Sequence, residues 1–337
     1  MSDINKLLGN DFSGAVYIAH NRKTIYNKAY GYADLPNKIP NDINTKFQTA
    51  SAGKGFVATG ILQLIEKKEL SFESNIGDIL DFNLKQINPE ITIRQLLNHT
   101  SGIPDYFDEA TMENYADLWS DYPNYKIRAS SDLVPLFINK PMLYPAGEKF
   151  QYNNTGYAVL GLIIEKLTGL KFDEYLKHNI FIPSGMKDTG YFELDRLPEK
   201  CANAYIFDDI RKDYYTNIYS IDVKGTGAGG AFTTVFDMES FWYKLIDGKL
   251  ISYNMLQQML TPQVENGCYG YGIWVDKKEN GKYSYHLEGC DPGVSFISAY
   301  DIEEDLFITL VSNFGCNVWK AYKNLLQYLK EFNSFGL

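Results

Sequence analysis

Apolar and polar residues alternate at both ends of the chain, and this pattern predicts β-strands there. Residues 13–33 are typical of a hairpin, with strand-like runs on either side of a polar turn at residues 21–23. Near the other end, three further runs have strand character, at residues 271–275, 293–300 and 306–311. An amphipathic helix is predicted to follow them, from Val318 to Phe332.

The middle of the chain has the spacing of helices instead. After Ser51, apolar residues recur every three or four positions as far as Lys67, which makes one apolar helix face. Residues 93–97 and 158–165 show the same period. The segment from Tyr106 to Tyr125 is rich in aromatic and acidic residues without a firm period, and we expect it to line a cleft and to recognise an apolar or aromatic group.

This order of elements predicts one sheet built from both ends of the chain, with helices inserted between them. The expected sheet domain is discontinuous, formed by residues 1–74 and 225–337, and the expected helical domain spans residues 75–224. Ligand pockets favour such junctions, so the active site is expected between the two parts.

Composition narrows the possible functions. The 337 residues are 45% apolar and 22% charged, as in an ordinary globular protein. The 32 Lys and Arg residues against 42 Asp and Glu residues give a net charge of −10, which repels phosphate backbones and disfavours a nucleic-acid partner. No apolar run reaches the ~18–20 residues that a membrane span needs.

The first ten residues lack the basic and apolar regions of a secretory signal, so the chain as written is expected to be cytoplasmic. A signal peptide removed earlier would leave no trace, and the protein would then be extracytoplasmic.

Metal and nucleotide chemistry have no support in the sequence. The four histidines are scattered, and the four cysteines form no C-x-x-C pair, so we expect free thiols, no metal site and no cofactor. The glycine-rich segment at residues 225–230 lacks the Lys-Ser/Thr of a phosphate-binding loop.

An S-x-x-K sequence, Ser51 to Lys54, opens the first predicted helix. Residues three apart share a helix face, so the Lys54 amine can lie beside the Ser51 hydroxyl. A helix N-terminus and partial burial both disfavour an ammonium, and a neutral Lys54 could accept the serine proton. The tetrapeptide alone is weak, because a second match from Ser184 to Lys187 also occurs; that match contains Gly185 and is typical of a turn.

Longer sequence motifs distinguish the S-x-x-K sequence at Ser51 from the one at Ser184. They follow, in order, the patterns T-I-R-x-L-L-x-H-T-S-G-x-P, P-x-G-x-x-F-x-Y-x-N-x-G-Y, I-F-x-P-L-G-M-x-x-T and G-x-G-G-x-x-S/T-T-x-x-D-[LM], at residues 92–104, 145–157, 180–189 and 227–238, with Ser184 at the place of the leucine in the third pattern. In these segments the chain resembles the serine β-lactamase and penicillin-binding protein superfamily, in its class C-like branch, which also contains esterases and D-aminopeptidases. The resemblance implies an α+β fold of the β-lactamase/transpeptidase type, with a mainly antiparallel sheet flanked by helices beside an all-helical domain.

The resemblance also implies roles for particular residues. Ser51 would be the nucleophile that forms an acyl-enzyme, with Lys54 as its proton acceptor. Tyr152 would shuttle the proton to the leaving group and activate water, which requires a cation such as Lys54 to lower its pKa. Asn154 would hold substrate. The structural alternatives are a helix N-cap for Ser51, a surface position for Lys54 and a loop cap for Asn154.

This chain departs from the third sequence motif of that superfamily. Its K-T-G or H-x-G triplet falls on residues 287–289, so that Glu288 and Gly289 occupy it and His286 stands one position early. On a strand this offset turns His286 to the opposite face unless a bulge intervenes. We therefore count His286, Glu288, Gly289 and Cys290 as candidate substrate-binding residues, with the backbone N–H groups of Ser51 and Cys290 as the oxyanion hole. Glu288 would repel a substrate carboxylate if it faced the cleft.

The sequence thus predicts a serine hydrolase that acts on an ester, amide or lactam bond of a small molecule or short peptide. The missing cation favours an esterase or small-peptide hydrolase over a β-lactamase or a cell-wall DD-peptidase. The alternative is a non-catalytic family member that binds a ligand or serves as a scaffold. Nothing in the sequence indicates the oligomeric state.

Overall fold

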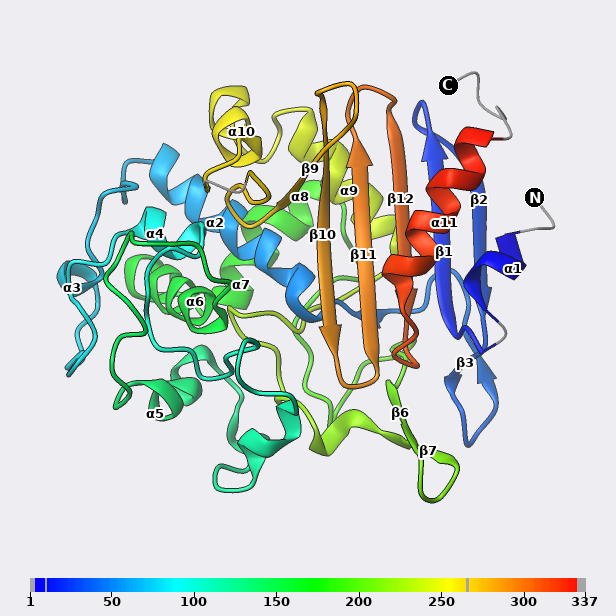
Figure 1. Ribbon diagram of the computed structural model, residues 1–337, viewed down its shortest axis with the longest axis horizontal. Helices are drawn as coiled ribbons and strands as arrows, with labels where there is room; N and C mark the ends of the chain where they lie inside the picture. Colours follow the sequence, from blue (N-terminus) through cyan, green and yellow to red (C-terminus); the bar gives the residue numbers. More distant parts are fainter. Residues whose placement is uncertain (1–3, 10, 265–266, 332–337) are drawn as a thin grey trace.

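The two ends of the chain form one six-stranded sheet. The computed structural model describes residues 4–9, 11–264 and 267–331. The strands lie in the order β2-β1-β12-β11-β10-β9, and every neighbouring pair is antiparallel (Figure 1). Their bounds are Gly14–His20 (β1), Lys23–Tyr30 (β2), Trp274–Lys277 (β9), Tyr283–Asp291 (β10), Val294–Asp301 (β11) and Leu306–Ser312 (β12).

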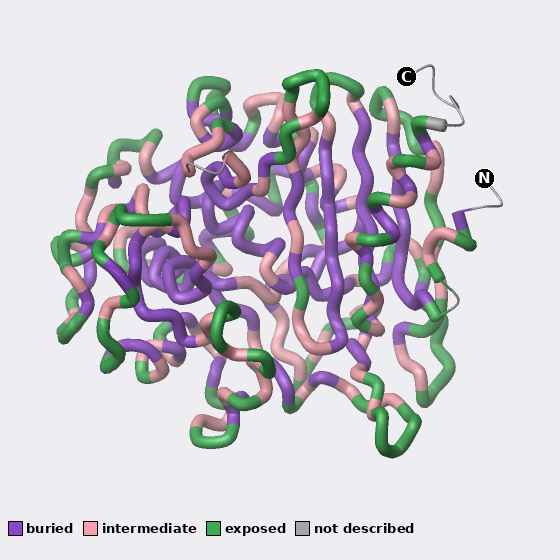
Figure 2. Tube along the Cα trace, in the orientation of Figure 1, coloured by how far each residue is buried: buried purple, intermediate pink, exposed green. Residues whose placement is uncertain are grey.

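The central strands are buried on both faces, because helices cover the sheet from two sides. Helix α11 (Val318–Glu331), with α1 (Ile4–Leu8) beside it, packs on one face against apolar residues of β1, β11 and β12 (Figure 1). Helices α2 (Lys54–Glu66) and α9 (Val235–Ile246) cover the other face. There the buried Trp242 donates from its indole nitrogen to Ser298 Oγ at 3.0 Å. The core therefore consists of two apolar layers with the sheet between them. Figure 2 shows the central strands and the helices next to them as buried segments.

The remaining helices gather beside this sheet. The longest of them, α6 (Asn154–Thr168), is buried over most of its length and begins where the Asn153 side chain accepts from the Gly156 amide. The others are α3 (Ile76–Ile79), α4 (Ile93–Leu97), α5 (Val134–Phe137), α7 (Phe172–Leu176), α8 (Ile182–Ser184) and α10 (Tyr253–Leu260). Shorter helical turns are η1 (Ala50–Gly53), η2 (Tyr115–Trp119), η3 (Asn124–Lys126), η4 (Ser130–Leu133), η5 (Lys177–Phe181) and η6 (Asn217–Tyr219).

Three small two-stranded sheets connect these parts. They pair β3 (Tyr32–Asp34) with β4 (Ile39–Pro40), β5 (Phe47–Gln48) with β8 (Phe232–Thr233), and β6 (Tyr205–Asp208) with β7 (Asp213–Thr216). The β5–β8 pair fixes the entry of the chain into η1, and thereby places Ser51 near the edge of the helical region.

The predicted α+β fold of the β-lactamase/transpeptidase type is confirmed, with differences at single elements. The strand predicted at residues 271–275 begins only at Trp274, because Gly272 adopts a φ of 73° and Tyr271 turns to stack on Phe72. The predicted C-terminal helix is present as α11, and Phe332 lies outside the described residues. The division into two domains at residues 75 and 225 stays a prediction. Within the described ranges, no helix is long and apolar enough to cross a membrane.

Burial of α11 on the sheet predicts a large stability effect at its inner face. Leu325 is 1% exposed among residues from β1 and β12. Leu325→Ala should lower the free energy of unfolding by about 2–5 kcal/mol, because it removes buried methyl groups and leaves a cavity. Chemical denaturation of the purified protein measures this change. Lys320→Ala, at an exposed position of the same helix, is the control and should stay near the wild type; equal effects would contradict the packing described here.

Candidate active site

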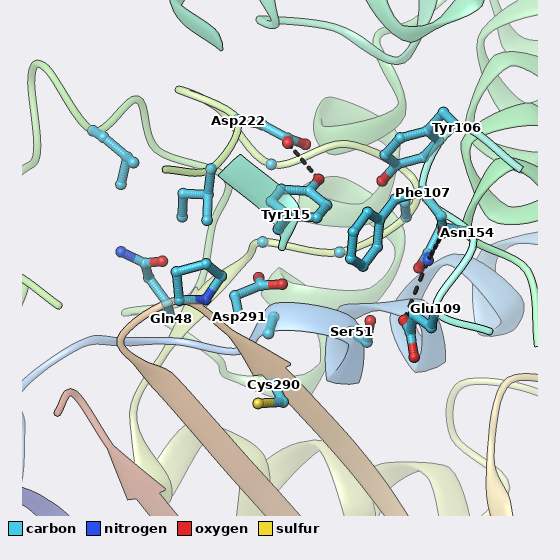
Figure 3. A pocket seen from close by; sticks show the side chains of 18 of the residues that line it. Gln48, Ser51, Tyr106, Phe107, Glu109, Tyr115, Asn154, Asp222, Cys290 and Asp291 are labelled. Carbon is cyan, nitrogen blue, oxygen red and sulfur yellow. Dashed lines mark hydrogen bonds between the residues drawn. The ribbon is translucent and has the colours of Figure 1, made fainter. Parts of the chain in front are cut away.

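Ser51 lies inside η1, at the edge of a cavity of about 460 Å³ (Figure 3). The preceding residue, Ala50, has a φ of 45°, which is the left-handed region that residues other than glycine seldom adopt. The Ala50 carbonyl accepts from the Gly230 amide at 3.0 Å, which holds this conformation in place. Ser51 is not the N-cap of α2, since Gly53 occupies that position. Such strain is typical of functional sites and presents the Ser51 hydroxyl to the cavity.

Lys54 is buried directly beneath Ser51, so the surface position considered above is wrong. Lys54 is only 2% exposed. Its Nζ donates to Ser51 Oγ at 2.8 Å, to Asn154 Oδ1 at 2.8 Å and to the Ala228 carbonyl at 2.5 Å. Burial lowers the pKa of Lys54 to about 8, although Glu109 and Asp291 act in the opposite direction. A sizeable fraction of the amine is therefore neutral near pH 8.

The neutral form of Lys54 suits proton transfer. A neutral amine has two N–H groups and one lone pair, and the two carbonyl oxygens of Asn154 and Ala228 can take both N–H groups. The lone pair is then directed to the remaining neighbour, the Ser51 hydroxyl. In this geometry, the Ser51 proton can pass to Lys54 Nζ.

Tyr152 stands next to this pair in an aromatic environment. Its ring lies 4.9 Å from Lys54 Nζ and stacks on Trp274, with 5.8 Å between ring centroids. Burial raises the pKa of Tyr152 well above its usual range, Tyr269 adds to this, and a hydrogen bond with Ser51 only partly offsets it. The expectation that Lys54 lowers this pKa is wrong, and Tyr152 is a neutral phenol next to Ser51.

Asn154, the first residue of α6, joins Lys54 to the neighbouring loop. Its Oδ1 accepts from Lys54, and its Nδ2 donates to the Phe107 carbonyl at 3.2 Å and to Glu109 Oε1 at 3.3 Å. The buried Asp105 carboxylate accepts from the Asn154 backbone N–H at 2.8 Å and so fixes the start of the helix. Asn154 therefore positions the amine and also ties down the loop.

The structure does not bring His286 or Glu288 to the cavity. Strand β10 pairs with β11 without a register shift from Tyr285 to Asp291, so no bulge moves His286 to the other face. The His286 ring packs against Trp319 of α11, with 4.6 Å between centroids, and its Nδ1 lies 2.7 Å from Asp276 Oδ2. Glu288 lies on the same face of the sheet, 3.8 Å from His286 Nε2. Their prediction as substrate-binding residues is wrong, because strand alternation directs both toward α11.

Gly289 and Cys290 do lie at the site. A Cβ on Gly289 would come within 2.3 Å of the Thr49 carbonyl oxygen and 2.6 Å of the Ser51 nitrogen, so only glycine allows β10 to pass this close. Cys290 and Asp291 line the cavity, and Figure 3 shows the Asp291 carboxylate directed into it. The last residues of β10 thus form one wall beside Ser51.

Several cavity residues carry no motif and were missed by sequence reasoning. Asp222 accepts from the Tyr115 hydroxyl at 2.7 Å, and burial raises its pKa to about 6. Burial, reinforced by Asp222, raises the pKa of Asp291 to about 8. Tyr106, Phe107 and Tyr115 line the cavity, as expected for their segment. Trp119 of that segment is instead buried and donates to the Ser220 carbonyl at 2.9 Å.

Comparison with known families agrees with this geometry. The family model described as Beta-lactamase matches residues 9–320. The chain belongs to the β-lactamase family. Within this serine β-lactamase and penicillin-binding protein superfamily, it is 30% identical to penicillin-binding protein 4* of Bacillus subtilis over 322 residues, which cover 90% of this chain and 68% of the relative.

Solved structures of the superfamily superpose over nearly the whole chain. A penicillin-binding protein from Bacillus halodurans shares 36% identity with a TM-score of 0.92, covering 97% of this chain and 99% of the other. D-amino acid amidase from Ochrobactrum anthropi SV3, complexed with L-phenylalanine, has a TM-score of 0.81 over 99% of both chains at 22% identity, which shows the shared fold.

The position of His286 against α11 predicts a structural role. His286→Ala should lower the free energy of unfolding by about 1–3 kcal/mol, because it leaves a gap between Trp274 and Trp319. The rate at which a fluorophosphonate labels the folded protein should stay unchanged. Denaturation curves and intact-mass kinetics measure the two effects. Unchanged stability with a large loss of labelling would place His286 in the site after all.

Proposed function

We propose that the protein is a serine hydrolase that acts through a Ser51 acyl-enzyme on an ester, amide or lactam bond. The observation that carries this proposal is the set of three contacts made by the buried Lys54 amine, which leaves its lone pair for the Ser51 hydroxyl. A binding module has no need of an amine held at a lowered pKa beside a serine.

In the acylation step, the Ser51 proton passes to Lys54 Nζ while Ser51 Oγ attacks the substrate carbonyl carbon. The negative charge that develops on the carbonyl oxygen is stabilised by the backbone N–H groups of Ser51 and Cys290. The close approach of Gly289 to the Ser51 nitrogen supports this oxyanion hole, since it brings β10 alongside η1.

When the tetrahedral intermediate collapses, the bond to the leaving group breaks and that group must take up a proton. Tyr152, a neutral phenol that hydrogen bonds with Ser51, donates this proton and is reprotonated from Lys54. Water then attacks the acyl carbonyl and gives one proton to the same pair of Lys54 and Tyr152. The bond between Ser51 Oγ and the acyl carbon breaks, that proton returns to Ser51 Oγ, and the acid is released.

The cavity supports an esterase or small-peptide hydrolase rather than a β-lactamase or a DD-peptidase. Among its described lining residues there is no Lys, Arg or His to bind a substrate carboxylate. The cation of the third motif is also absent from the sequence, where Leu287, Glu288 and Gly289 stand in its place. The alternative, a non-catalytic ligand-binding or scaffold protein, is tested by the labelling experiment below.

Covalent labelling tests the nucleophile. Intact mass after incubation with a fluorophosphonate should show one adduct on the wild type and none on Ser51→Ala, because the activated hydroxyl is removed. Ser184→Ala, in the second S-x-x-K sequence, is the matched control and should label like the wild type. No adduct on a folded wild-type sample would favour the non-catalytic alternative.

The lowered pKa of Lys54 predicts the pH dependence of this labelling. The neutral amine is the base, so the labelling rate should rise with pH up to about 8 and then level off. At pH 6 most of the amine is protonated and the rate should fall about tenfold for each pH unit below the pKa. Lys54→Met should abolish this rise, and a wild-type rate independent of pH between 6 and 9 would contradict Lys54 as the base.

A further inference from the structure

One histidine next to the site takes no part in the acyl-enzyme steps. His99 is 1% exposed, and its ring contacts the Tyr152 ring, with 4.5 Å between the ring centroids and 38° between the planes. The rings of Tyr157 and Tyr269 lie against the same imidazole, with centroid distances of 5.1 and 4.8 Å. A buried polar ring beside the proposed proton donor calls for a physical explanation.

The backbone of His99 has a conformation that suits glycine better. His99 follows the C-cap residue of α4, where glycine is most common, and its φ is 59°. The Thr100 N–H donates to the Gln95 carbonyl at 2.9 Å and the His99 N–H to the Leu96 carbonyl at 3.4 Å, which is the hydrogen-bond pattern of that helix ending. Glycine would adopt this conformation without strain. The backbone therefore does not call for a histidine, and the reason for it lies in the side chain.

His99 holds the residues on both sides of Tyr152. Its carbonyl oxygen accepts from the Gln151 N–H at 3.0 Å, and its Nδ1 accepts from the Asn153 N–H at 3.1 Å. Tyr152 stands between these two residues, and its ring lies against the imidazole. A single residue thus restrains the Tyr152 backbone from both sides and its ring from one.

These contacts also fix the protonation state of His99. Because Nδ1 accepts a hydrogen bond, it carries no proton, and the neutral ring has its proton on Nε2. Nε2 is buried and has no hydrogen-bond partner among the described residues. Burial lowers the pKa of His99 well below its usual range, and the nearby Lys54 lowers it further. The imidazole is therefore a fixed acceptor at neutral pH and not a proton carrier.

The start of α6 has a separate anchor that does not involve His99. The Asp105 carboxylate accepts from the N–H groups of Asn154 and Thr155, at 2.8 and 3.0 Å, and from the Thr155 hydroxyl at 3.0 Å. Asn154 in turn accepts from the Lys54 amine. Loss of the His99 imidazole therefore leaves the contact between Asn154 and Lys54 in place.

We propose that His99 is a positioning residue, which holds the Tyr152 phenol in the orientation from which it donates a proton to the leaving group. The inference rests on the proposed hydrolase function and assigns a further residue to it. When the bond between the acyl carbon and the leaving oxygen breaks, the electron pair goes to that oxygen, which takes the Tyr152 proton. Only a basic leaving group needs this proton, so the effect of His99 depends on the leaving group.

Two esters with the same acyl group test this dependence. The nitrophenolate of para-nitrophenyl acetate departs as a stable anion without a proton, whereas phenyl acetate releases a more basic phenolate. His99→Gly removes the side chain and suits the left-handed backbone. It should lower kcat/KM for phenyl acetate about tenfold more than kcat/KM for para-nitrophenyl acetate, since a general acid contributes about 10²–10⁴-fold. Fluorophosphonate labelling, in which fluoride leaves, should stay near the wild-type rate.

Two further variants separate positioning from folding. His99→Asn keeps an acceptor close to the place of Nδ1 and also tolerates the left-handed backbone, so it should recover part of the lost phenyl acetate activity. Leu325→Ala, in the layer on the opposite face of the sheet, should lower stability without changing the ratio of the two kcat/KM values. Equal losses for both esters in His99→Gly, or a ratio changed as much by Leu325→Ala, would overturn the inference.

Nuclear magnetic resonance of isotope-labelled histidine tests the His99 hydrogen bond without turnover. The imidazole signal that disappears in His99→Gly belongs to His99. It should show a neutral ring with the proton on Nε2 from about pH 6 to about pH 9, because Nδ1 accepts from Asn153. A signal that titrates in this range, or a proton on Nδ1, would contradict the inference, since neither form can accept that hydrogen bond.

The two proposals fail in different ways. Absence of a Ser51-dependent fluorophosphonate adduct removes the hydrolase, whatever the state of His99. A normal adduct with equal losses for the two esters keeps the hydrolase and removes the positioning role. If the wild type is labelled but hydrolyses neither acetate, the His99 signal decides the inference.

Discussion

The site depends on one buried amine that joins three distant parts of the chain. Lys54 Nζ contacts Ser51 three residues away, Asn154 after 100 residues and the Ala228 carbonyl after 174 residues. Burying a charged amine is unfavourable, so the protein keeps it by providing an oxygen for each N–H and by lowering its pKa. The start of α2, the start of α6 and the glycine-rich segment before β8 are thereby fixed relative to one another.

Much of this arrangement could be predicted from the sequence because it follows from local patterns. Alternation at residues 13–33 and 306–311 indicated that both ends of the chain contribute strands to the sheet, and the S-x-x-K spacing placed Lys54 beside Ser51. Those features depend on neighbours a few residues apart. The direction of the Tyr152 pKa was not accessible in this way, since it is set by burial and by Tyr269, which lies 117 positions later.

The third motif shows how a strand register decides a role. His286 stands one residue before the first position of the expected triplet, residue 287. Because β10 pairs with β11 without a register shift, the His286 ring lies against Trp319 on the opposite face of the sheet. The sequence left this open, because a bulge cannot be read from composition alone. The carboxylates of Asp222 and Asp291 were missed for a similar reason: they meet only when a loop and a strand end come together across one cavity.

The strained Ala50 has a consequence for the order in which a working site can form. Its φ of 45° is held by Gly230, and the wall beside Ser51 comes from β10, so both restraints lie far along the chain. During synthesis from the N-terminus, Ser51 and Lys54 are made well before either restraint exists. A nascent or prematurely ended chain therefore lacks both restraints on Ser51. Under the mechanism proposed above, the serine would become reactive only once the C-terminal strands have joined the sheet.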